Sequence, residues 1–384
     1  MSAGLQPDLV AAALWSFLAA FLLMARPFRP GLAFLLVAIK IAVPLAHFSL
    51  GLLDTGAWRL IDDAKYVEEA ANLRGTLLAG GAATDQLFAT AEGHHVGYYV
   101  WNIFAQQLFG EHYFSAVFLN VVLTCLAARG LLRLLKLVGV PNGYALAAGV
   151  FFLLHWDVIA WSSFFNMKDP FVMTLSVWLF VYAMELVKHV RLRSLLGFLS
   201  IAGLLYFFRW YVPVLASAGL GAWGLFHLRG WRRNALLLTG AAMLVVIPLH
   251  GEFPRELLQP AGLLDGAFKF AMTPRPWGMS EGYRFLLIPS ALHWILTPLA
   301  LFGAVHLWRT RPLARPMICY VIVLFCFYAM VPRLYGPRHR FQCVFVLSWL
   351  QFHGLYTCLR QAFARPAPRA GEAASTMTLS TAGR

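Results

Sequence analysis

The residues of this sequence best suited to acid-base chemistry gather in one short segment, 60–75, which reads LIDDAKYVEEAANLRG. It holds four acidic residues in an otherwise apolar chain: Asp62, Asp63, Glu68 and Glu69. At helical spacing Asp62, Tyr66 and Glu69 share one face, which predicts an amphipathic helix at a membrane surface. A positioned carboxylate there can take a proton from a hydroxyl group. Asp62 is the first candidate for this role and Asp63 the second; a merely solvated surface helix is the alternative.

Basic residues suited to binding a phosphate lie in later turns of the chain. Lys and Arg donate charge-assisted hydrogen bonds to anionic oxygens and stabilise charge on a departing phosphate. The candidate substrate-binding residues are Tyr66, Lys168, Asp169, Arg209, Arg338, His339 and Arg340. The turn at 168–170 also fits an ordinary helix start, with a proline in the first turn and an acid near the positive end of the helix dipole. Arg338 and Arg340 also fit anchors for lipid head groups.

Metal binding is not indicated by the spacing of the histidines. His94, His95 and His339 lack the spacing typical of zinc or other transition-metal ligands. We therefore assign no metal site and no certain cofactor, and a bound divalent cation stays open.

The composition determines which elements must hold these residues. Hydrophobic residues make up 60% of the chain and charged residues only 12%. A soluble domain of this size needs more charged surface, whereas a bilayer accepts apolar residues on the outside. The chain is therefore predicted to be an all-α, polytopic membrane protein in which each apolar run of about 20 residues is a spanning helix.

The apolar runs predict about eleven spanning helices within one transmembrane domain, residues 1–365. The predicted spans are 9–25, 31–53, 113–135, 143–156, 170–187, 195–208, 211–228, 235–249, 285–308, 317–331 and 341–360. Two larger outer loops are expected at 54–112, which carries amphipathic interfacial helices, and at 250–284. The tail 366–384 has too little apolar content to fold and is predicted to be disordered and cytoplasmic.

The distribution of basic residues predicts the orientation of these spans. Lys and Arg cluster in alternate loops, and the positive-inside rule then puts the N-terminus outside and the C-terminus in the cytoplasm. All the candidate residues above fall on the outer side. The formal net charge of +14 is thus interpreted as a sign of topology and of attraction to anionic membrane lipids, and no nucleic-acid partner is expected.

Several short motifs on the predicted outer side resemble those of one protein family, and they occur in the same order along the chain. An acidic pair followed by Tyr and Ala, an interfacial segment ending in Phe-Gly, a Lys-Asp-Pro turn and a late Arg-rich turn are similar to those of GT-C fold glycosyltransferases, which use polyprenyl-phosphate donors. The residues concerned are Asp62, Asp63, Tyr66, Ala70, His95, Tyr98, Phe109, Gly110, Asn120, Lys168, Asp169, Pro170, Arg338, His339, Arg340 and Phe341. The likeness is to the bacterial branch that includes protein mannosyltransferases and the aminoarabinose transferase. The sequence departs from that pattern in having an extra N-terminal span, no folded C-terminal domain, and Asp-Asp in place of the commoner Asp-Glu.

This resemblance implies a bacterial inner-membrane enzyme with its active site facing the periplasm. Its donor would be a polyprenyl-phosphate sugar, and its acceptor a glycolipid, a polysaccharide or a protein. Asp62 would take the acceptor proton, while Lys168, or Arg338 with Arg340, would stabilise the departing phosphate. The rival interpretations are an O-antigen polymerase or ligase, whose key residues would lie near 252–256, and a transporter or inactive scaffold.

Overall fold

The computed structural model of the chain describes residues 6–50, 61–78, 83–91, 95–227, 230, 262–279, 286–331 and 336–363. Within these ranges the chain forms helices and no strands. In chain order they are α1 (Pro7–Met24), α2 (Pro30–Leu50), α4 (Ile61–Leu78), α5 (Ala83–Thr90), α6 (Val96–Phe109), α7 (Tyr113–Val138), α8 (Asn142–Leu153), α9 (Trp156–Ser163), α10 (Asp169–Lys188), α11 (Leu192–Arg209), α12 (Tyr211–His227), α14 (Leu263–Met272), η3 (Pro276–Gly278), α15 (Leu287–Thr310), η5 (Pro312–Ala314), α16 (Arg315–Ala329), α17 (Pro337–Phe341) and α18 (Val344–Phe363). The predicted tail 366–384 lies outside the described residues.

Seven of the described helices are long and apolar enough to cross a membrane. They are α1, α2, α7, α10, α11, α15 and the combined helix Pro312–Ala329. Helices α8 and α9 form an eighth candidate that bends by 47°. Among the described residues the predicted all-α class is confirmed, and several helices are long and apolar enough to span a membrane.

Of the other three predicted spans, two do not reach this standard and one is not described. α12 is a shorter apolar helix, and the segment 235–249 lies outside the described residues. α18 is long enough with 20 residues, but buried polar side chains such as Gln351 and Ser348 interrupt its apolar sequence. Such side chains pack against other helices rather than face lipid, so a count of apolar residues underrates this helix.

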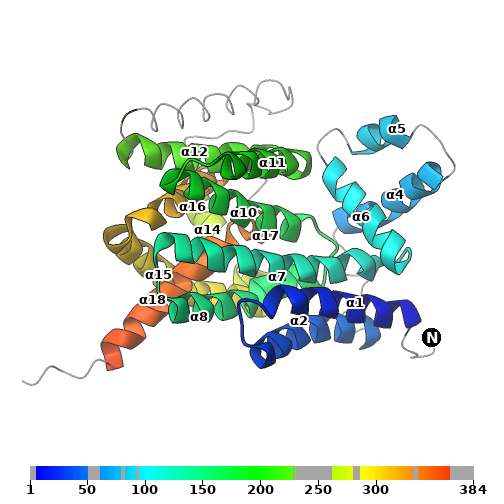
Figure 1. Ribbon diagram of the computed structural model, residues 1–384, viewed down its shortest axis with the longest axis horizontal. Helices are drawn as coiled ribbons and strands as arrows, with labels where there is room; N and C mark the ends of the chain where they lie inside the picture. Colours follow the sequence, from blue (N-terminus) through cyan, green and yellow to red (C-terminus); the bar gives the residue numbers. More distant parts are fainter. Residues whose placement is uncertain are drawn as a thin grey trace, which may run out of the picture.

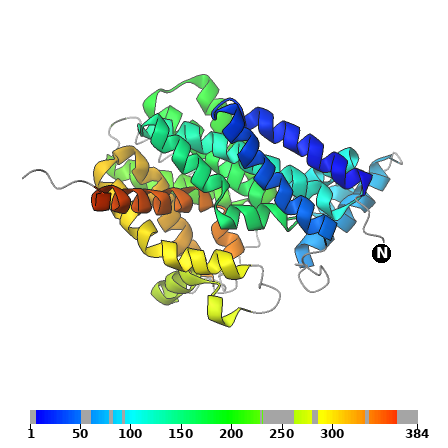
Figure 2. The same ribbon diagram turned by 90° about the horizontal axis from the view of Figure 1, so that it is seen from below.

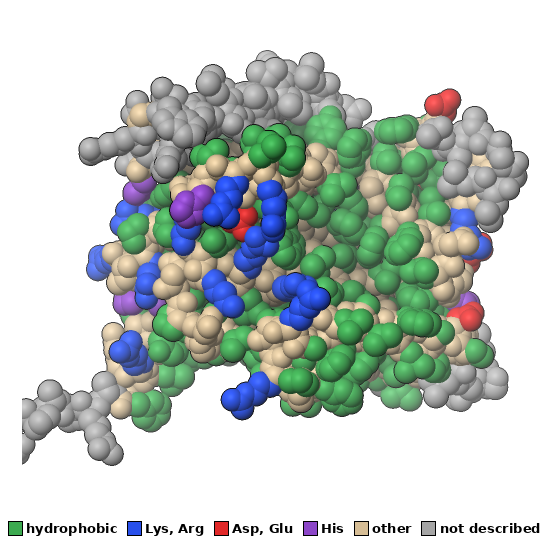
Figure 3. All heavy atoms as spheres, in the orientation of Figure 1, with side chains coloured by type: hydrophobic (Ala, Val, Ile, Leu, Met, Phe, Trp, Pro, Cys, Tyr) green, Lys and Arg blue, Asp and Glu red, His purple; other side chains and the backbone are tan. Residues whose placement is uncertain are grey.

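The helices form an elongated bundle around α7, the most buried of the spanning helices. Figures 1 and 2 show α4, α5 and α6 together at one end of this bundle, near the N-terminus, while α18 ends at the other. Figure 3 shows hydrophobic side chains over the middle of the bundle, and Leu14, Trp15 and Leu22 are among those exposed. Exposed apolar surface along the bundle is what a bilayer would cover.

The layer formed by α4–α6 is held to the bundle by polar contacts. His112 Nε2 lies 2.9 Å from Asp8 Oδ2 on α1, and Arg74 Nη1 donates to Glu111 Oε1 at 3.0 Å. Between α4 and α6, Gln106 Nε2 donates to the carbonyl of Val67 at 2.9 Å. The predicted interfacial helices therefore lie where α1 and α7 begin.

A glycine pair brings α15 and α18 into backbone contact. A Cβ at Gly303 would lie 2.1 Å from the Leu350 carbonyl oxygen, and one at Gly354 would lie 2.1 Å from the Leu299 carbonyl oxygen. Only glycine allows this approach, which is common where helices pack in membranes. It holds the middle of α18 against α15.

Candidate functional site

Asp169 lies at the centre of the candidate site. It is the first residue of α10, ahead of Pro170, and its side chain is fully buried. Its Oδ2 accepts a hydrogen bond from Arg338 Nε on α17 at 2.9 Å. Its Oδ1 lies 3.0 Å from Nη2 of Arg209, the last residue of α11, within ion-pair distance but without hydrogen-bond geometry. The consecutive helices α10 and α11 and the distant helix α17 thus meet at one carboxylate.

Among the described residues, cations outnumber carboxylates around Asp169. Lys168 and Arg209 are buried, and Arg338 is mostly buried. Lys168 and His339 are both close enough to act electrostatically on Asp169, and Lys168 Nζ lies 2.6 Å from His95 Nδ1 at the start of α6. We call Lys168, Asp169, Arg209, Arg338 and His339 the Asp169 cluster. Three cations against one carboxylate, out of bulk water, favour the binding of a further anion.

Two buried nitrogen atoms of this cluster have no hydrogen-bond partner among the described residues. They are Nη1 of Arg209, whose side chain is only 4% exposed, and Nδ1 of His339. Burial, together with the positive charges of Arg209 and Arg338, holds the pKa of His339 well below its ordinary value of 6.5. His339 is therefore neutral near pH 7. Leaving a buried donor unpaired is costly, so these atoms mark a place for a ligand.

Asp63 lies in a separate hydrogen-bonded arrangement that leads to the same turn. It is fully buried on α4, and its Oδ2 accepts a hydrogen bond from the Tyr113 hydroxyl. Its Oδ1 accepts one from the Ala64 N–H at 2.7 Å. The Tyr113 hydroxyl in turn accepts a hydrogen bond from the Asn166 N–H at 3.3 Å. One tyrosine thus connects the acidic helix to the loop that ends in Lys168 and Asp169.

A network of buried polar side chains fixes the loop that ends in Lys168. Tyr98 donates its hydroxyl hydrogen to Asn166 Oδ1 at 2.6 Å, and Asn166 Nδ2 donates to Asn102 Oδ1 at 2.6 Å. Asn120 Nδ2 donates to the Tyr98 hydroxyl at 3.2 Å and to the Met167 carbonyl at 3.1 Å. Burial is the main cause that raises the pKa of Tyr98 well above its ordinary value, so its hydroxyl stays a donor.

Tyr66 connects the acidic helix α4, to which it belongs, with the Asp169 cluster. Its ring packs on Tyr98 and Tyr99, with centroid separations of 4.8 Å and 5.4 Å. It is also close enough to Arg209 to interact electrostatically. The backbone of Asp62 lies in α4, but its side chain is outside the described residues. Glu252, Arg255 and Glu256, which bear on the rival polymerase interpretation, are outside them as well.

Arg340 lies apart from the Asp169 cluster. Its Nη1 donates to the carbonyls of Phe270, Ala271 and Thr273 at 3.1, 3.0 and 2.7 Å. These carbonyls end α14 and have no intrahelical partner, so Arg340 caps that helix. Arg338 and Arg340 are two positions apart on α17, which sends their side chains in roughly opposite directions. The structure therefore brings together all the predicted substrate-binding residues except Arg340.

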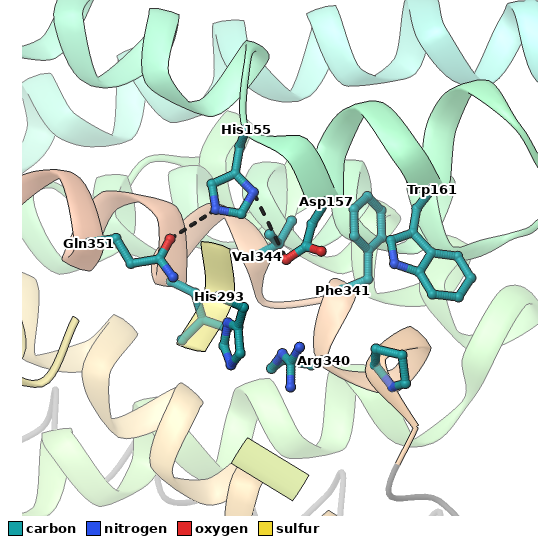
Figure 4. A pocket seen from close by; sticks show the side chains of 10 residues that line it. His155, Asp157, Trp161, His293, Arg340, Phe341, Val344 and Gln351 are labelled. Atoms are coloured by element: carbon teal, nitrogen blue, oxygen red, sulfur yellow. Dashed lines mark hydrogen bonds and ion pairs between the residues drawn. The ribbon is translucent and has the colours of Figure 1, made fainter. Parts of the chain in front are cut away.

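A small polar cavity lies beside Arg340, lined by side chains of α9, α15, α17 and α18. Figure 4 shows His155 and Asp157 on one side of it, with His293 and Arg340 opposite. His155 Nε2 lies 2.9 Å from Gln351 Oε1, and His155 Nδ1 lies 4.0 Å from Asp157 Oδ2. The cavity volume is about 10 Å³, which is close to the room that one water molecule needs. A sugar or a phosphate does not fit there.

Tyr113 and Asn102 are site residues that the sequence did not single out. Asn102 lies four positions after Tyr98, so the two share a face of α6, which is a readable signal. Tyr113 begins an apolar span and looks like an interfacial aromatic residue. Within the described residues, no group of three or more His, Cys, Asp or Glu side chains is arranged to hold a metal ion.

Comparisons with protein-family models, with curated proteins and with solved structures gave no match to this chain. The argument for its function therefore rests on its own residues and on their geometry.

Proposed function

We propose that this chain is a membrane glycosyltransferase that moves a sugar from a polyprenyl-phosphate carrier to an acceptor on the outer face of the membrane. The observation that carries the proposal is Arg209 Nη1 in the Asp169 cluster, a buried cationic donor that has no protein acceptor among the described residues. A phosphate oxygen supplies that acceptor. The motifs that resemble those of GT-C enzymes suggest the rest of the proposal: a polyprenyl phosphate as the carrier and sugar transfer as the reaction.

Removal of the acceptor proton is assigned to Asp62. Both oxygens of its neighbour Asp63 already accept hydrogen bonds, from Tyr113 and from the Ala64 N–H, so Asp63 is better suited to fixing the start of α4 than to taking a proton. Asp62 would accept the hydrogen of the acceptor hydroxyl while the acceptor oxygen attacks the anomeric carbon. Tyr66, one turn further on, would line the sugar pocket.

Departure of the lipid phosphate is assigned to Lys168, Arg209 and Arg338. As the bond between the anomeric carbon and the phosphate oxygen breaks, that oxygen gains negative charge. Cations already fixed nearby stabilise this charge more in the transition state than in the ground state. Asp169 holds Arg338 and Arg209 in place. These cations therefore need little rearrangement to stabilise the departing phosphate. The apolar polyprenyl tail would lie along the apolar surface of the spanning helices.

The location of the site is part of the proposal. The chain would lie in a bacterial inner membrane with α4–α6 outside and the end of α10 inside. Reporter fusions after Ala91 and after Arg191 should report opposite sides, outside and then inside. The same side for both would rule out this topology.

Lipid analysis of cells that lack the protein tests the reaction. A sugar-bearing polyprenyl phosphate should accumulate, and expression of the wild-type chain should remove it, whereas expression of Asp62→Asn should not. Accumulation of a longer lipid-linked glycan, with sensitivity at Glu252 and not at Asp62, would favour a polymerase or ligase instead. No lipid change at all would favour a transporter or a scaffold.

A further inference from the structure

A second charged cavity lies at the opposite end of the bundle from the Asp169 cluster. Its volume is about 270 Å³, and it lies where α7 and α10 end and α11 begins. The side chains that matter here are Arg133, Glu185, Lys188, Arg191, Arg193 and Ser194. We call this cavity the inner basic pocket.

One carboxylate ties the three helices of this pocket together. Glu185 on α10 forms an ion pair with Arg133 on α7 and accepts a hydrogen bond from the Ser194 hydroxyl on α11 at 2.9 Å. The Arg133 guanidinium also lies 5.9 Å from the centre of the Trp178 ring. The wall of the pocket is therefore fixed by contacts between the helices and does not depend on a ligand.

The remaining cations of the pocket are not neutralised by the part of the chain that is described. The side chains of Lys188, Arg191 and Arg193 form no ion pair or hydrogen bond with the described residues, and the only described carboxylate lining the pocket, Glu185, is engaged by Arg133. Figure 3 shows Lys and Arg side chains gathered on this face around a histidine and an acidic side chain. Like charges this close repel one another, and a bound anion relieves that repulsion.

Two helices of this pocket, α10 and α11, carry residues of the Asp169 cluster, Asp169 and Arg209, at their other ends. Asp169 is the first and Lys188 the last residue of α10, which has 20 residues, a length of about 30 Å that matches the apolar thickness of a bilayer. Arg311 at the end of α15 donates to the Gly139 carbonyl at the end of α7 at 3.1 Å. The pocket thus belongs to the membrane face opposite the candidate site, where basic pockets between helices suit anionic head groups.

We propose that the inner basic pocket binds a phosphate-bearing anion at the cytoplasmic face. The cavity is smaller than a pocket for a drug-sized ligand, so it fits a phosphate with a short substituent rather than a nucleotide. The phosphate belongs either to the head group of an anionic lipid or to a water-soluble phosphorylated compound. This site is separate from the sugar-transfer site, and its test does not depend on that activity.

Binding to the purified chain in neutral detergent tests this proposal. Phosphatidylglycerol and neutral phosphatidylcholine are titrated by native mass spectrometry, and inorganic phosphate by calorimetry. The pocket variant is Lys188→Gln/Arg191→Gln/Arg193→Gln. The control variant, Lys136→Gln/Arg309→Gln/Arg360→Gln, removes the same types of charge from exposed positions near the same end of the bundle.

Wild-type protein should prefer phosphatidylglycerol to phosphatidylcholine, and the pocket variant should bind phosphatidylglycerol roughly 10- to 100-fold more weakly, with the control variant changed less than about threefold. Binding of phosphatidylglycerol without binding of inorganic phosphate identifies a lipid head group. Inorganic phosphate that binds and is lost in the pocket variant identifies a soluble phosphorylated ligand. If the triple variant does not fold, Arg191→Gln should still weaken binding about fivefold. Equal losses in the pocket and control variants, or no preference for phosphatidylglycerol together with no phosphate binding, would overturn the proposal.

Discussion

Two arginines on one short helix, the partly buried Arg338 and the buried Arg340, make different contacts. Arg338 meets a carboxylate that it shares with Arg209, and among the described residues the cations around it outnumber the carboxylates. Arg340 meets three backbone carbonyls that close α14, and no surplus of charge needs a ligand there. The difference shows that burial alone does not mark a binding arginine. The proposed binding role of Arg338 rests instead on the carboxylate that it shares with Arg209, whose Nη1 has no partner among the described residues.

The largest effect is expected when the carboxylate that holds the Asp169 cluster is removed. Asp169→Asn removes the carboxylate that faces the buried guanidinium of Arg209, which should lower the free energy of unfolding by about 3–5 kcal/mol. Chemical denaturation of the purified protein in mixed micelles measures it. Asp157→Asn, beside Arg340, is the matched change in the other region and should lower it by less than about 1 kcal/mol.

Added inorganic phosphate tests the difference between the Asp169 cluster and the surroundings of Arg340. A millimolar concentration of inorganic phosphate should restore part of the stability of Asp169→Asn, because an anion can replace the lost carboxylate. It should not restore any loss in Asp157→Asn. Equal responses of the two variants would remove the distinction between the regions.

The next effect concerns turnover. Arg338→Gln should lower the rate of sugar transfer on the order of 10²-fold, because one fixed donor to the departing phosphate is lost. Arg338→Lys should fall between this variant and wild type, since Lys keeps the charge but loses the fork of donors. Transfer from a labelled polyprenyl-phosphate sugar measures both. Full activity in Arg338→Gln would assign phosphate binding to other residues.

Arg340→Gln should show the reverse pattern. Loss of the cap on α14 leaves buried carbonyls unpaired and should lower the free energy of unfolding by about 1–3 kcal/mol. The folded fraction should transfer sugar at close to the wild-type rate. A normal stability with a large loss of turnover would instead support the phosphate role predicted from the sequence.

The smallest effect is a dependence on pH. The pKa of His339 is well below 6.5 in the folded chain, so the unfolded chain binds more protons below about pH 6.5 and the free energy of unfolding falls as the pH falls through that range. His339→Asn removes this contribution. The variant should lose less stability than wild type between about pH 7 and 5, by at most about 1.4 kcal/mol per pH unit. Parallel pH curves for the two proteins would show that His339 does not titrate in this way.

Much of the site could be predicted because its residue types are rare in apolar sequence. Lys168, Asp169, Arg209 and Arg338 stand out as charges at the ends of predicted spans, and the structure brings these four together. The sequence could not predict the direction in which each arginine side chain of α17 points. Whether Arg338 or Arg340 faces the cluster depends on how α17 is rotated, and a five-residue helix has no periodic pattern from which to read this.

Span count and buried polar partners were also hard to predict, for a shared reason. Apolar sequence predicts a spanning helix when its surface faces lipid, but α18 buries Ser348 and Gln351 among other helices. Asn102 is likewise buried within its network. Which polar side chains find partners is decided by tertiary packing, and a single sequence does not contain that information.

The most direct test of the account is the release of polyprenyl phosphate by the purified chain. Wild-type and Asp62→Asn proteins are reconstituted in liposomes that contain the donor lipid accumulated by deficient cells, together with an extract of acceptor. Wild-type protein should release polyprenyl phosphate as it transfers the sugar, and Asp62→Asn should do so on the order of 10²-fold more slowly. A wild-type protein that leaves the donor intact, or an Asp62→Asn variant as fast as wild type, would contradict the account.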